Sequence, residues 1–527
     1  MPHSQHNADT RLDASAPPEW FNFASHLLKV NESRAAKVAY IDDERSTTYG
    51  ELADRVKRFA SALRALGLRR EERLLVAMLD TADLPTVFLG ALYAGVVPVL
   101  VNTLLPASDY AYMLTHCDAR AVVVSGPLRD TLREAMANAH TDVPIVIARP
   151  HAQRAPGEPA LETLIHDAAP VEPAATHADD IAFWLYSSGS TGKPKGTVHS
   201  HANLHWTAEL YAKPILGIQE SDVVFSAAKI FFAYGLGNAL TFPLSVGATT
   251  VLVAERPTPD VVFDRLTRHK PTIFYGVPTL YVAMLASAKL PPREHVTLRV
   301  CASAGEALPA LVGERFTAHF GCEILDGIGS TEMLHIYLSN RAGAVAYGTT
   351  GTPVPGYEVE LRDEHGKTVE DGEIGELYVK GPSSALLYWR SHHKSRSTFQ
   401  GEWLKTGDKY QRRPDGNYVY AGRSDDMLKV SGQYVSPIEV EAVLQSHVAV
   451  LEAAVIGRPD ANGLVRTCAF VVVRDGHRGD AALDAALKEF VKTRLTPHKY
   501  PREIVFVAQL PKTATGKIQR FKLRENT

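Results

Sequence analysis

The chain has 527 residues, 45% of them hydrophobic and 22% charged, with a formal net charge of −3. This is the composition of a large globular protein with more than one domain, and it gives no basic surplus for a nucleic-acid or anionic-membrane partner. The cysteines, Cys117, Cys301, Cys322 and Cys468, lie far apart in the sequence, which argues against a disulfide framework or a zinc site and favours a reduced cytoplasmic protein.

The chain opens with a polar stretch, residues 1–17, that has no apolar signal core, so we expect disorder there and no export. The uncharged stretch from Leu84 to Asn102 approaches the length of a membrane span. Prolines and glycines interrupt it, so we predict a buried helix at about Pro85–Ala94, a buried strand at Val97–Val101, and no membrane partner.

Short apolar runs then alternate with helical patterns. The runs "RLLVAML", "AVVVSG", "PIVIA", "IAFWLY", "ATTVLVA" and "TIFYGV" are typical of parallel strands that helices bury on both faces. From Gly351 the alternating residues and Gly-rich turns predict a small antiparallel barrel or sheet. The last hundred or so residues predict a compact α+β unit, in which Ser436, Pro437 and Glu439 make a capping box at a helix start.

The segment "YSSGSTGKPKG", from Tyr186 to Gly196, follows a predicted buried strand, and a helical pattern opens near Ala202. Backbone N–H groups can approach an anion where no Cβ intervenes, so the loop predicts phosphate binding, with a flexible surface loop as the alternative. It is not a Walker loop, because Ser187 stands at the first glycine position and Pro194 follows Lys193. "GLGNAL" is not a Rossmann fingerprint, because Leu240 replaces the third small residue.

The loop resembles the signature of the adenylate-forming enzymes, which include acyl-CoA synthetases, peptide-synthetase adenylation domains and firefly luciferase. Further segments follow in that family's order: "SAGEALP" at Ser303, "DGIGSTE" at Asp326, "WLKTGD" at Trp403, "GRSDDMLKVSGQYVSPIEVE" at Gly422 and "PKTATGKIQR" at Pro511. The resemblance implies an α/β fold with a large N-terminal domain, residues 1–424, of stacked α/β subdomains and a small β-barrel-like part. A small mobile α+β C-terminal domain, residues 425–527, follows.

Enzymes of this family join a carboxylate to ATP, giving acyl-AMP and pyrophosphate, and a thiol then attacks the acyl-AMP. Each unscreened unit charge at 4 Å costs about 4 kcal/mol near a protein surface, so bringing the acid to the nucleotide requires cations. The resemblance implies ATP, Mg²⁺ and coenzyme A. It assigns Glu332 to Mg²⁺, Thr331 to a phosphate, and Lys517 to the transition-state charge on the acid and the α-phosphate. A solvated Glu and a solvated tail lysine are the alternatives.

The resemblance also assigns the nucleotide contacts. Asp408 would bind the ribose hydroxyls, Asp326 the adenine amino group, and Arg423 the ribose or a phosphate. Ile328 replaces a tyrosine that relatives often carry beneath the adenine, so the aromatic face is lost. The phosphate-loop residues are Ser187, Ser188, Gly189, Ser190, Thr191, Gly192, Lys193 and Lys195, and the residues along the base are Gly305, Glu306 and Ala307.

For thiol attack the C-terminal domain of such enzymes rotates about a hinge, here Asp425, and Gly432 would let the backbone approach the pantetheine arm. A turn residue is the alternative for Asp425. No carrier module follows residue 527, so we expect free coenzyme A as the acceptor. Oligomeric state stays open between monomer and homodimer.

Aromatic residues mark the acyl pocket, which by resemblance comprises Phe231, Phe232, Tyr234, Gly235, Ala302, Gly327, Gly329, His335 and Ile336. They predict a short flat slot that suits a benzene ring, although each could be a core residue. Phe232 replaces a histidine that moves as a gate in many relatives, and His335 could face the ring or support it from behind.

The whole chain resembles benzoate–CoA ligases more than acetyl- or long-chain synthetases, so we predict benzoate as the acid. Hydroxy-, amino- and fluorobenzoates are the alternatives, because one added hydroxyl changes a pocket's preference by only about 1–3 kcal/mol. An acyl-phosphate-forming kinase and a non-catalytic nucleotide-binding protein are the competing functions.

Overall fold

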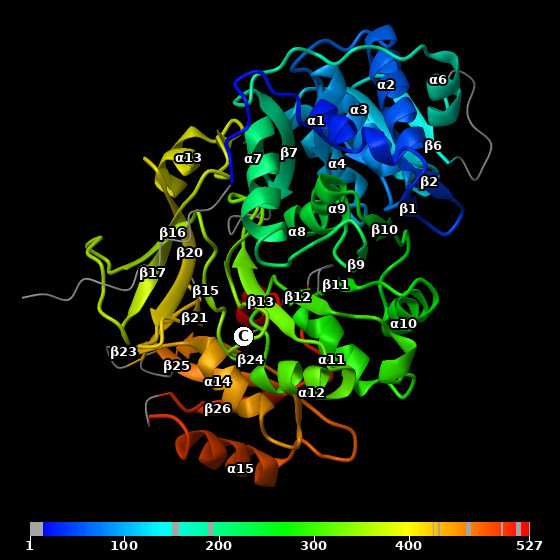
Figure 1. Cartoon of the computed structure of the whole chain (residues 1–527). Coiled ribbons are helices and arrows are strands. Elements are labelled where there is room, and N and C mark those ends of the chain that lie inside the picture. The colour runs from blue at the N-terminus through cyan, green and yellow to red at the C-terminus, as the bar shows by residue number, and fades with distance from the viewer. Residues whose placement is uncertain are drawn as a thin grey trace, which may run out of the picture.

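The computed structural model describes residues 14–149, 158–187, 193–424, 426–430, 433–459, 465–496, 499–512 and 518–525. Figure 1 shows the N-terminal elements in blue and cyan at the top, a green body in the middle, a yellow sheet at the side, and the orange and red C-terminal elements at the bottom. This α/β arrangement, with a large N-terminal part and a small C-terminal one, confirms the predicted fold class.

The upper sheet has the strand order β18–β8–β7–β4–β3–β5–β6. Its parallel strands are β3 (Arg73–Ala77), β4 (Val97–Leu100), β5 (Ala119–Ser125), β6 (Ile145–Ala148) and β7 (Ile181–Ser187). Leu74 and Val76 pack in the core cluster that contains α2 (Tyr49–Ala65) and α3 (Asp83–Ala94). Leu75 and Ala77 pack in the cluster of α4 (Ala107–His116) and α5 (Arg129–Asn138), so both faces are buried as predicted.

The middle sheet has the order β15–β14–β13–β12–β11–β9–β10–β1–β2. Its parallel strands are β1 (Val38–Ile41), β9 (Val223–Ser226), β10 (Thr249–Val251), β11 (Ile273–Gly276), β12 (Val300–Ser303) and β13 (Ile324–Gly329). The edge strands β2 (Ser46–Thr48), β14 (Ile336–Ser339) and β15 (Thr352–Pro353) are antiparallel. Helices α10 (Pro259–Arg268), α11 (Pro278–Ala286) and α12 (Ala310–Phe320) bury one face.

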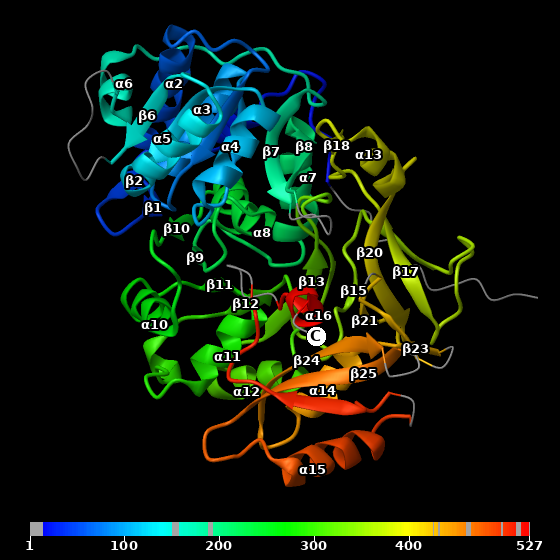
Figure 2. The ribbon, with the colours of Figure 1, turned by 180° about the vertical axis from the view of Figure 1, so that it is seen from behind.

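The side sheet is antiparallel, as the alternation after Gly351 predicted. It contains β16 (Glu358–Arg362), β17 (Ile374–Lys380), β19 (Phe399–Gln400), β20 (Trp403–Arg412) and β21 (Tyr418–Arg423). Leu361 and Leu377 on this sheet share a core cluster with Tyr275 and Leu325 of the middle sheet. Figure 2 shows the side sheet from behind, standing beside β13 and above the C-terminal elements.

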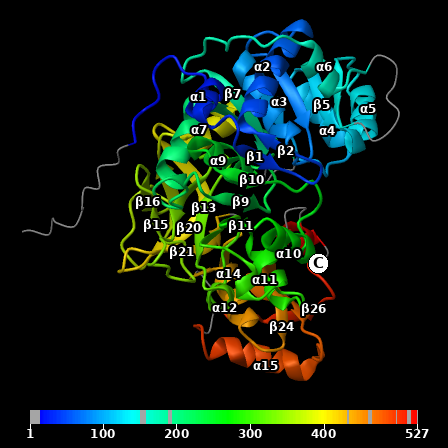
Figure 3. The same cartoon turned by 45° about the vertical axis from the view of Figure 1, so that its right-hand side comes forward.

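The C-terminal part is α+β, as predicted. The hairpin β22 (Leu428–Val430) and β23 (Gln433–Val435) precedes the sheet of β24 (Val450–Pro459), β25 (Val465–Val473) and β26 (Glu503–Phe506). Its helices are α14 (Pro437–Gln445), α15 (Ala481–Lys492) and α16 (Arg520–Glu525). Figure 3 shows α15 at the bottom, on the side away from the blue elements, while α14 lies against β21.

The remaining elements are short. They are α1 (Phe23–Val30), α6 (Leu161–Asp167), α7 (His201–Thr207), α8 (Ala233–Leu236), α9 (Phe242–Val246) and α13 (His392–Thr398), the π segments Ala208–Ala212 and Gly237–Thr241, and the 3₁₀ turns Glu32–Arg34, Gly126–Leu128 and Arg293–His295. The stretch from Leu84 forms α3 and β4, close to the predicted bounds. Within the described ranges, the helices lack the length and apolar character that a membrane crossing requires.

Two local predictions were incomplete or wrong. A helix opens near Ala202 as expected, namely α7 (His201–Thr207), but the strand β8 (Lys195–Ser200) before it was not predicted. Together β8 and β18 (Leu387–Tyr388) form the antiparallel edge of the upper sheet. At α14, Ser436 Oγ accepts a hydrogen bond from the Glu439 N–H at 3.2 Å, as a capping residue should. The Glu439 carboxylate, however, accepts from Lys499 Nζ at 2.7 and 2.8 Å and does not complete the predicted capping box.

A buried carboxylate joins the first strands of the middle sheet to the upper one. Asp83, at the start of α3, has a side chain only 1% exposed. It accepts from Arg55 of α2 at 2.8 Å and from Arg149 after β6 at 2.7 Å, and it also pairs with Arg45 in the β1–β2 turn. Burial of a charge is tolerated here because the arginines supply both countercharge and hydrogen bonds.

We predict that Asp83→Asn lowers the free energy of unfolding by about 3 kcal/mol, because it leaves the arginines facing a neutral group. Glu162→Gln is the matched control: Glu162 binds Arg45 and Arg55 but is 50% exposed, so its loss should cost less than about 1 kcal/mol. Denaturant unfolding followed by far-UV circular dichroism measures both. Equal decreases in the free energy of unfolding for Asp83→Asn and Glu162→Gln would contradict the stabilising role given to Asp83.

Candidate active site

The phosphate-loop prediction falls on the β7–β8 hairpin. Ser187 ends β7 and pairs in register with Lys195, the first residue of β8, while residues 188–192 lie outside those described. The Lys193 ammonium lies 5.3 Å from the centre of the Tyr112 ring, and the Lys195 ammonium lies 4.5 Å from that of Tyr388. Each of these two ammonium groups therefore lies over an aromatic ring, which attracts it by a cation–π interaction.

Desolvation lowers the pKa of Lys195, the neighbouring Glu332 carboxylate opposes that shift, and Lys394 and Arg423 reinforce it. Three cations, Lys195 of the hairpin, Lys394 of α13 and Arg423 of β21, therefore lie close enough to influence one another. A cluster of like charges is unfavourable in the free protein and favourable when a polyanion enters. This is the electrostatic arrangement that the resemblance implied.

The Thr331–Glu332 turn follows β13 and faces the hairpin. The Glu332 carboxylate oxygen Oε1 accepts from the Tyr388 hydroxyl at 2.7 Å and from Ser187 Oγ at 3.4 Å. The structure therefore brings Ser187, Lys195 and Glu332 together although Ser187 and Glu332 are 145 residues apart. Tyr388 was missed by sequence reasoning, since it lies outside the motif segments.

Asp326, on β13 opposite Ser303 of β12, is 5% exposed. Its Oδ2 is 3.4 Å from the Leu308 N–H, whereas its Oδ1 and the Ser303 hydroxyl are buried without a hydrogen-bond partner among the described residues. Burial raises the pKa of Asp326 to about 8. A buried acceptor of this kind is costly unless a ligand or water donates to it, which fits a donor such as an amino group.

The predicted base-lining residues surround Asp326. Gly305 follows β12 with φ of 95°, a conformation that favours glycine, and Glu306 and Ala307 come next, both half-buried. Ile328 lies two residues beyond Asp326 on β13 and is also half-buried. An apolar side chain is thus available beside the predicted adenine position.

Asp408 and Arg423, both assigned to the ribose, are register partners on β20 and β21. Arg423 Nη1 donates to Asp408 Oδ1 at 3.1 Å, and the Asp408 side chain is 10% exposed. Thr406, whose carbonyl also accepts from Arg423, and Gly407, with φ of 78°, directly precede Asp408 on β20. The structure therefore brings these two predicted residues together.

His335, predicted to belong to the acyl pocket, is buried among the aromatic rings of Tyr211, Tyr234 and Phe242. Its ring centre is 5.5 Å from that of Tyr234, and its Nε2 lies 3.2 Å from Asn238 Oδ1. Burial lowers the pKa of His335 to about 3, so the ring is neutral. A Cβ on Gly237 would lie 2.5 Å from His335 Cδ2, so this glycine allows the close approach.

The other residues predicted for the acyl pocket pack against neighbouring parts of the chain. Gly327 and Gly329 on β13 lie against Ile336 of β14 and the backbone of His335 just before it, and Gly235 lies against the Lys229 carbonyl. Phe231 is 5% exposed and packs in the upper core cluster, 4.6 Å from Phe232, which is partly buried. Ala302 on β12 is fully buried and shares the core cluster of Tyr275.

Several predicted site residues lie outside those described: Ser188, Gly189, Ser190, Thr191, Gly192, Asp425, Gly432 and Lys517. On either side of the Lys517 segment, Lys512 and Ile518 form a β-bridge. The domain boundary at 424/425 likewise stays a prediction.

The residues present fit a magnesium ion that arrives with a nucleotide. In the part of the chain that the structure describes, no group of three or more His, Cys, Asp or Glu side chains gathers as a metal cage. Mg²⁺ in nucleotide sites takes one or two carboxylates and keeps its other ligands from phosphates and water. Glu332, oriented by Tyr388 through Oε1, would supply such a carboxylate.

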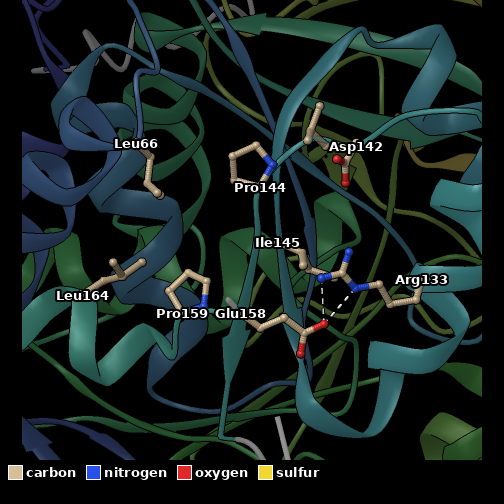
Figure 4. Close-up of a pocket in the computed structure, with 9 residues that line it drawn as sticks. Leu66, Arg133, Asp142, Pro144, Ile145, Glu158, Pro159 and Leu164 are labelled. Atoms are coloured by element: carbon tan, nitrogen blue, oxygen red, sulfur yellow. Dashed lines mark hydrogen bonds and ion pairs between the residues drawn. The ribbon is translucent and has the colours of Figure 1, made fainter. Parts of the chain in front are cut away.

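A cavity of about 580 Å³ lies elsewhere, at the β6 edge of the upper sheet (Figure 4). Leu66, Leu164 and Pro159 contribute apolar surface to its wall. Its Glu158 carboxylate, 1% exposed, pairs with Arg133 at 2.7 Å and with Arg129 at 2.7 Å. The arginines already neutralise the Glu158 carboxylate, and none of the described motif residues lines this cavity. The cavity is therefore not the candidate site.

A family model described as "AMP-binding enzyme" matches residues 28–389, and one described as "AMP-binding enzyme C-terminal domain" matches residues 439–517. The chain belongs to the AMP-binding enzyme family. The resemblance drawn from the motif segments is thereby confirmed.

Relatives within this family extend over the whole chain. A benzoate–CoA ligase of Thauera aromatica is 58% identical over 512 residues, 96% of each chain. The crystal structure of a benzoate CoA ligase from Burkholderia xenovorans LB400 has 66% identity and a TM-score of 0.90, covering 96% of this chain and all of that one. An anthranilate CoA ligase, AuaEII, in complex with anthranoyl-AMP, has 41% identity and a TM-score of 0.92, covering 97% and 98%.

The raised pKa of Asp326 predicts a pH-dependent cost to stability. Between the usual value of 3.8 and about 8, the unfolded chain loses this proton while the folded chain keeps it, so unfolding becomes easier by up to about 1.4 kcal/mol per pH unit. Asp326→Asn removes the effect. Its melting temperature relative to wild type should rise from pH 5 to pH 8 and level off above. The prediction would be contradicted by a difference in melting temperature between Asp326→Asn and wild type that does not change with pH.

Proposed function

We propose that this chain activates benzoate, or a close aromatic acid, with ATP to give acyl-AMP and pyrophosphate, and then transfers the acyl group to coenzyme A. The observation that carries the proposal is the meeting of Ser187, Lys195 and Glu332 between the upper and middle sheets. Asp326 lies on β13, which leads into the Glu332 turn, and the Asp408–Arg423 pair lies on β20 and β21. The arrangement offers cations to phosphates, a carboxylate to a metal ion, and acceptors to a nucleoside.

For the nucleotide, the hairpin backbone and its lysines bind the phosphates, and Thr331 donates its hydroxyl to one of them. Glu332 holds Mg²⁺, which supplies positive charge on the phosphate oxygens. Asp326 Oδ1 accepts from the adenine amino group, the partner that this buried oxygen lacks. Asp408, its carboxylate already oriented by Arg423, accepts from the ribose hydroxyls.

For the acid, the ring lies near His335 and Tyr234, with the carboxylate directed toward the nucleotide. A neutral histidine with a fully buried ring contributes an apolar wall and no charge that would attract the carboxylate away from ATP. Names of relatives support an aromatic acid: two are benzoate–CoA ligases, and one was crystallised with anthranoyl-AMP. Benzoate is the simplest acid that fits this set.

Lys517 is the residue to which we assign the positive charge that acts on the acid. It approaches the acid carboxylate and the α-phosphate during adenylation, where a positioned cation stabilises developing negative charge. Rotation about Asp425 then removes it and brings the Gly432 segment to the pantetheine arm of coenzyme A. The described cysteines are all unpaired and buried, which supports a reducing compartment such as the cytoplasm.

Product analysis over a panel of acids tests the proposal. With benzoate, hydroxy-, amino- and fluorobenzoates, acetate and a long-chain acid, we expect acid-dependent release of AMP and pyrophosphate, with the highest kcat/KM for benzoate. Benzoyl-CoA should form only when coenzyme A is present. Release of ADP would instead identify an acyl-phosphate-forming kinase, and an absence of turnover with every acid would favour a binding protein.

The role of Lys517 separates the two half-reactions. We predict that Lys517→Ala slows adenylation by about 100- to 1000-fold, because it removes one positioned donor. Thioester formation from supplied benzoyl-AMP should be largely retained. Lys512→Ala is the matched control, since Lys512 precedes Lys517 by five residues in the sequence and pairs with Glu452, and it should leave both steps near wild type. If Lys517→Ala slowed adenylation and thioester formation to the same extent, the role assigned to Lys517 would be wrong.

A further inference from the structure

A buried histidine links the hairpin strand to the predicted metal-binding turn. His199 lies on β8, 0% exposed, with its ring stacked on Phe183 at 5.2 Å between centres. Its Nε2 is 2.8 Å from the Thr331 carbonyl oxygen, and its Nδ1 is 2.9 Å from Asn203 Nδ2. Burial lowers the pKa of His199 to about 4, so it is neutral and carries one proton.

The surrounding bonds fix which nitrogen carries that proton. A carbonyl oxygen can only accept, so Nε2 must be the N–H that donates to Thr331. Asn203 is oriented independently: its Nδ2 donates to the Ser384 carbonyl at 3.0 Å, and its Oδ1 accepts from Ser200 Oγ at 2.9 Å. Its amide nitrogen therefore donates to His199 Nδ1, which selects the Nε2–H tautomer.

The carbonyl groups of this turn accept hydrogen bonds both from within the turn and from outside it. Thr331 O accepts from His199 Nε2 and from the Leu334 N–H at 3.2 Å, Glu332 O accepts from the Ala385 N–H at 2.7 Å, and Met333 O accepts from Ser383 Oγ at 2.8 Å and from the His335 N–H at 2.7 Å. Thr331 and Glu332 are only half-buried, so side-chain packing alone does not fix them. From outside the turn, the histidine holds the Thr331 carbonyl, and the 383–385 segment holds the next two carbonyls.

We propose that His199 is a positioning residue for the first half-reaction: its Nε2–H, oriented by Asn203, fixes the Thr331–Glu332 peptide so that the Thr331 hydroxyl and the Glu332 carboxylate meet the Mg²⁺–nucleotide phosphates. The inference rests on the proposed function and adds to it a residue outside the set assigned by resemblance. His199 touches neither acid nor nucleotide; it acts through the peptide that it holds.

Three substitutions separate positioning from mere filling of space. His199→Leu keeps an apolar side chain in the core but removes both ring nitrogens. His199→Gln carries an amide nitrogen that reaches the place of Nε2, so it restores the donor. His199→Asn stays polar, but its shorter amide reaches only the place of Nδ1 and cannot bind Thr331. Melting temperatures establish which variants are folded.

The measurements are calorimetric binding of Mg²⁺–ATP, pyrophosphate release at varied Mg²⁺–ATP and varied benzoate, and thioester formation from supplied benzoyl-AMP. For His199→Leu we expect kcat/KM for Mg²⁺–ATP to fall by about 10- to 100-fold, the scale of a misplaced catalytic group. KM for benzoate and the rate of thioester formation should change by less than about twofold, because those steps do not use the turn. His199→Gln should recover most of the loss, and His199→Asn should not.

Wild-type kinetics in folded His199→Leu would overturn the proposal. So would changes of equal size in kcat/KM for Mg²⁺–ATP, in KM for benzoate and in the rate of thioester formation. A His199→Gln variant with kinetics no better than those of His199→Leu would also overturn it. If His199→Leu does not fold, His199→Asn decides in its place. If only wild type folds, the histidine serves the fold and the proposal fails. Failure of the proposed function has a different signature, namely no acid-dependent pyrophosphate release by the wild-type protein.

Discussion

The site depends on holding one carboxylate in place at the seam between two sheets. Glu332 follows a strand of the middle sheet, whereas the groups that meet it, Ser187 and the Lys195 ammonium, come from the edge of the upper sheet. The Tyr388 hydroxyl reaches the same carboxylate from the next edge strand. Because charges at this distance interact strongly and fall off with separation, a small shift between the sheets would change the field at the phosphates. A buried ion pair elsewhere also connects the two sheets, because Arg45 in the β1–β2 turn pairs with Asp83 at the start of α3.

Two of the candidate binding groups, Asp326 and Lys195, lie in environments that lower the stability of the unliganded protein. Asp326 is buried with one oxygen lacking a partner, and its raised pKa expresses the penalty of ionising it there. Lys195 is partly desolvated beside other cations. Both conditions are unfavourable in the empty protein and are relieved by a nucleotide that brings donors and negative charge. Binding energy gained in this way is available for orienting the acid and ATP rather than for reorganising the protein.

Sequence reasoning reached much of the fold because buried parallel strands have a distinctive pattern. Continuous apolar runs such as those at β3, β5 and β7 are produced by burial on both faces, and the motif segments lie at or beside strand ends. β8 was missed because "KGTVHS" is polar and short, although it is buried, and β18 is too short to have a period. The second half of the capping box failed because Lys499, 60 residues away, competes for Glu439. The partners of Glu332 and Thr331 come from distant parts of the chain, and no local pattern reports them.

The short segment from residue 383 to residue 388 has a further consequence for how the protein is made. It supplies the bonds to the Glu332 and Met333 carbonyls and the Tyr388 hydroxyl, and it pairs with β8 beside the phosphate loop. During synthesis the phosphate loop leaves the ribosome almost two hundred residues before this segment does. Domains fold as units once their sequence has emerged. A nascent chain interrupted before residue 383 would therefore contain the whole loop and still lack the groups that orient the Glu332 carboxylate and its turn.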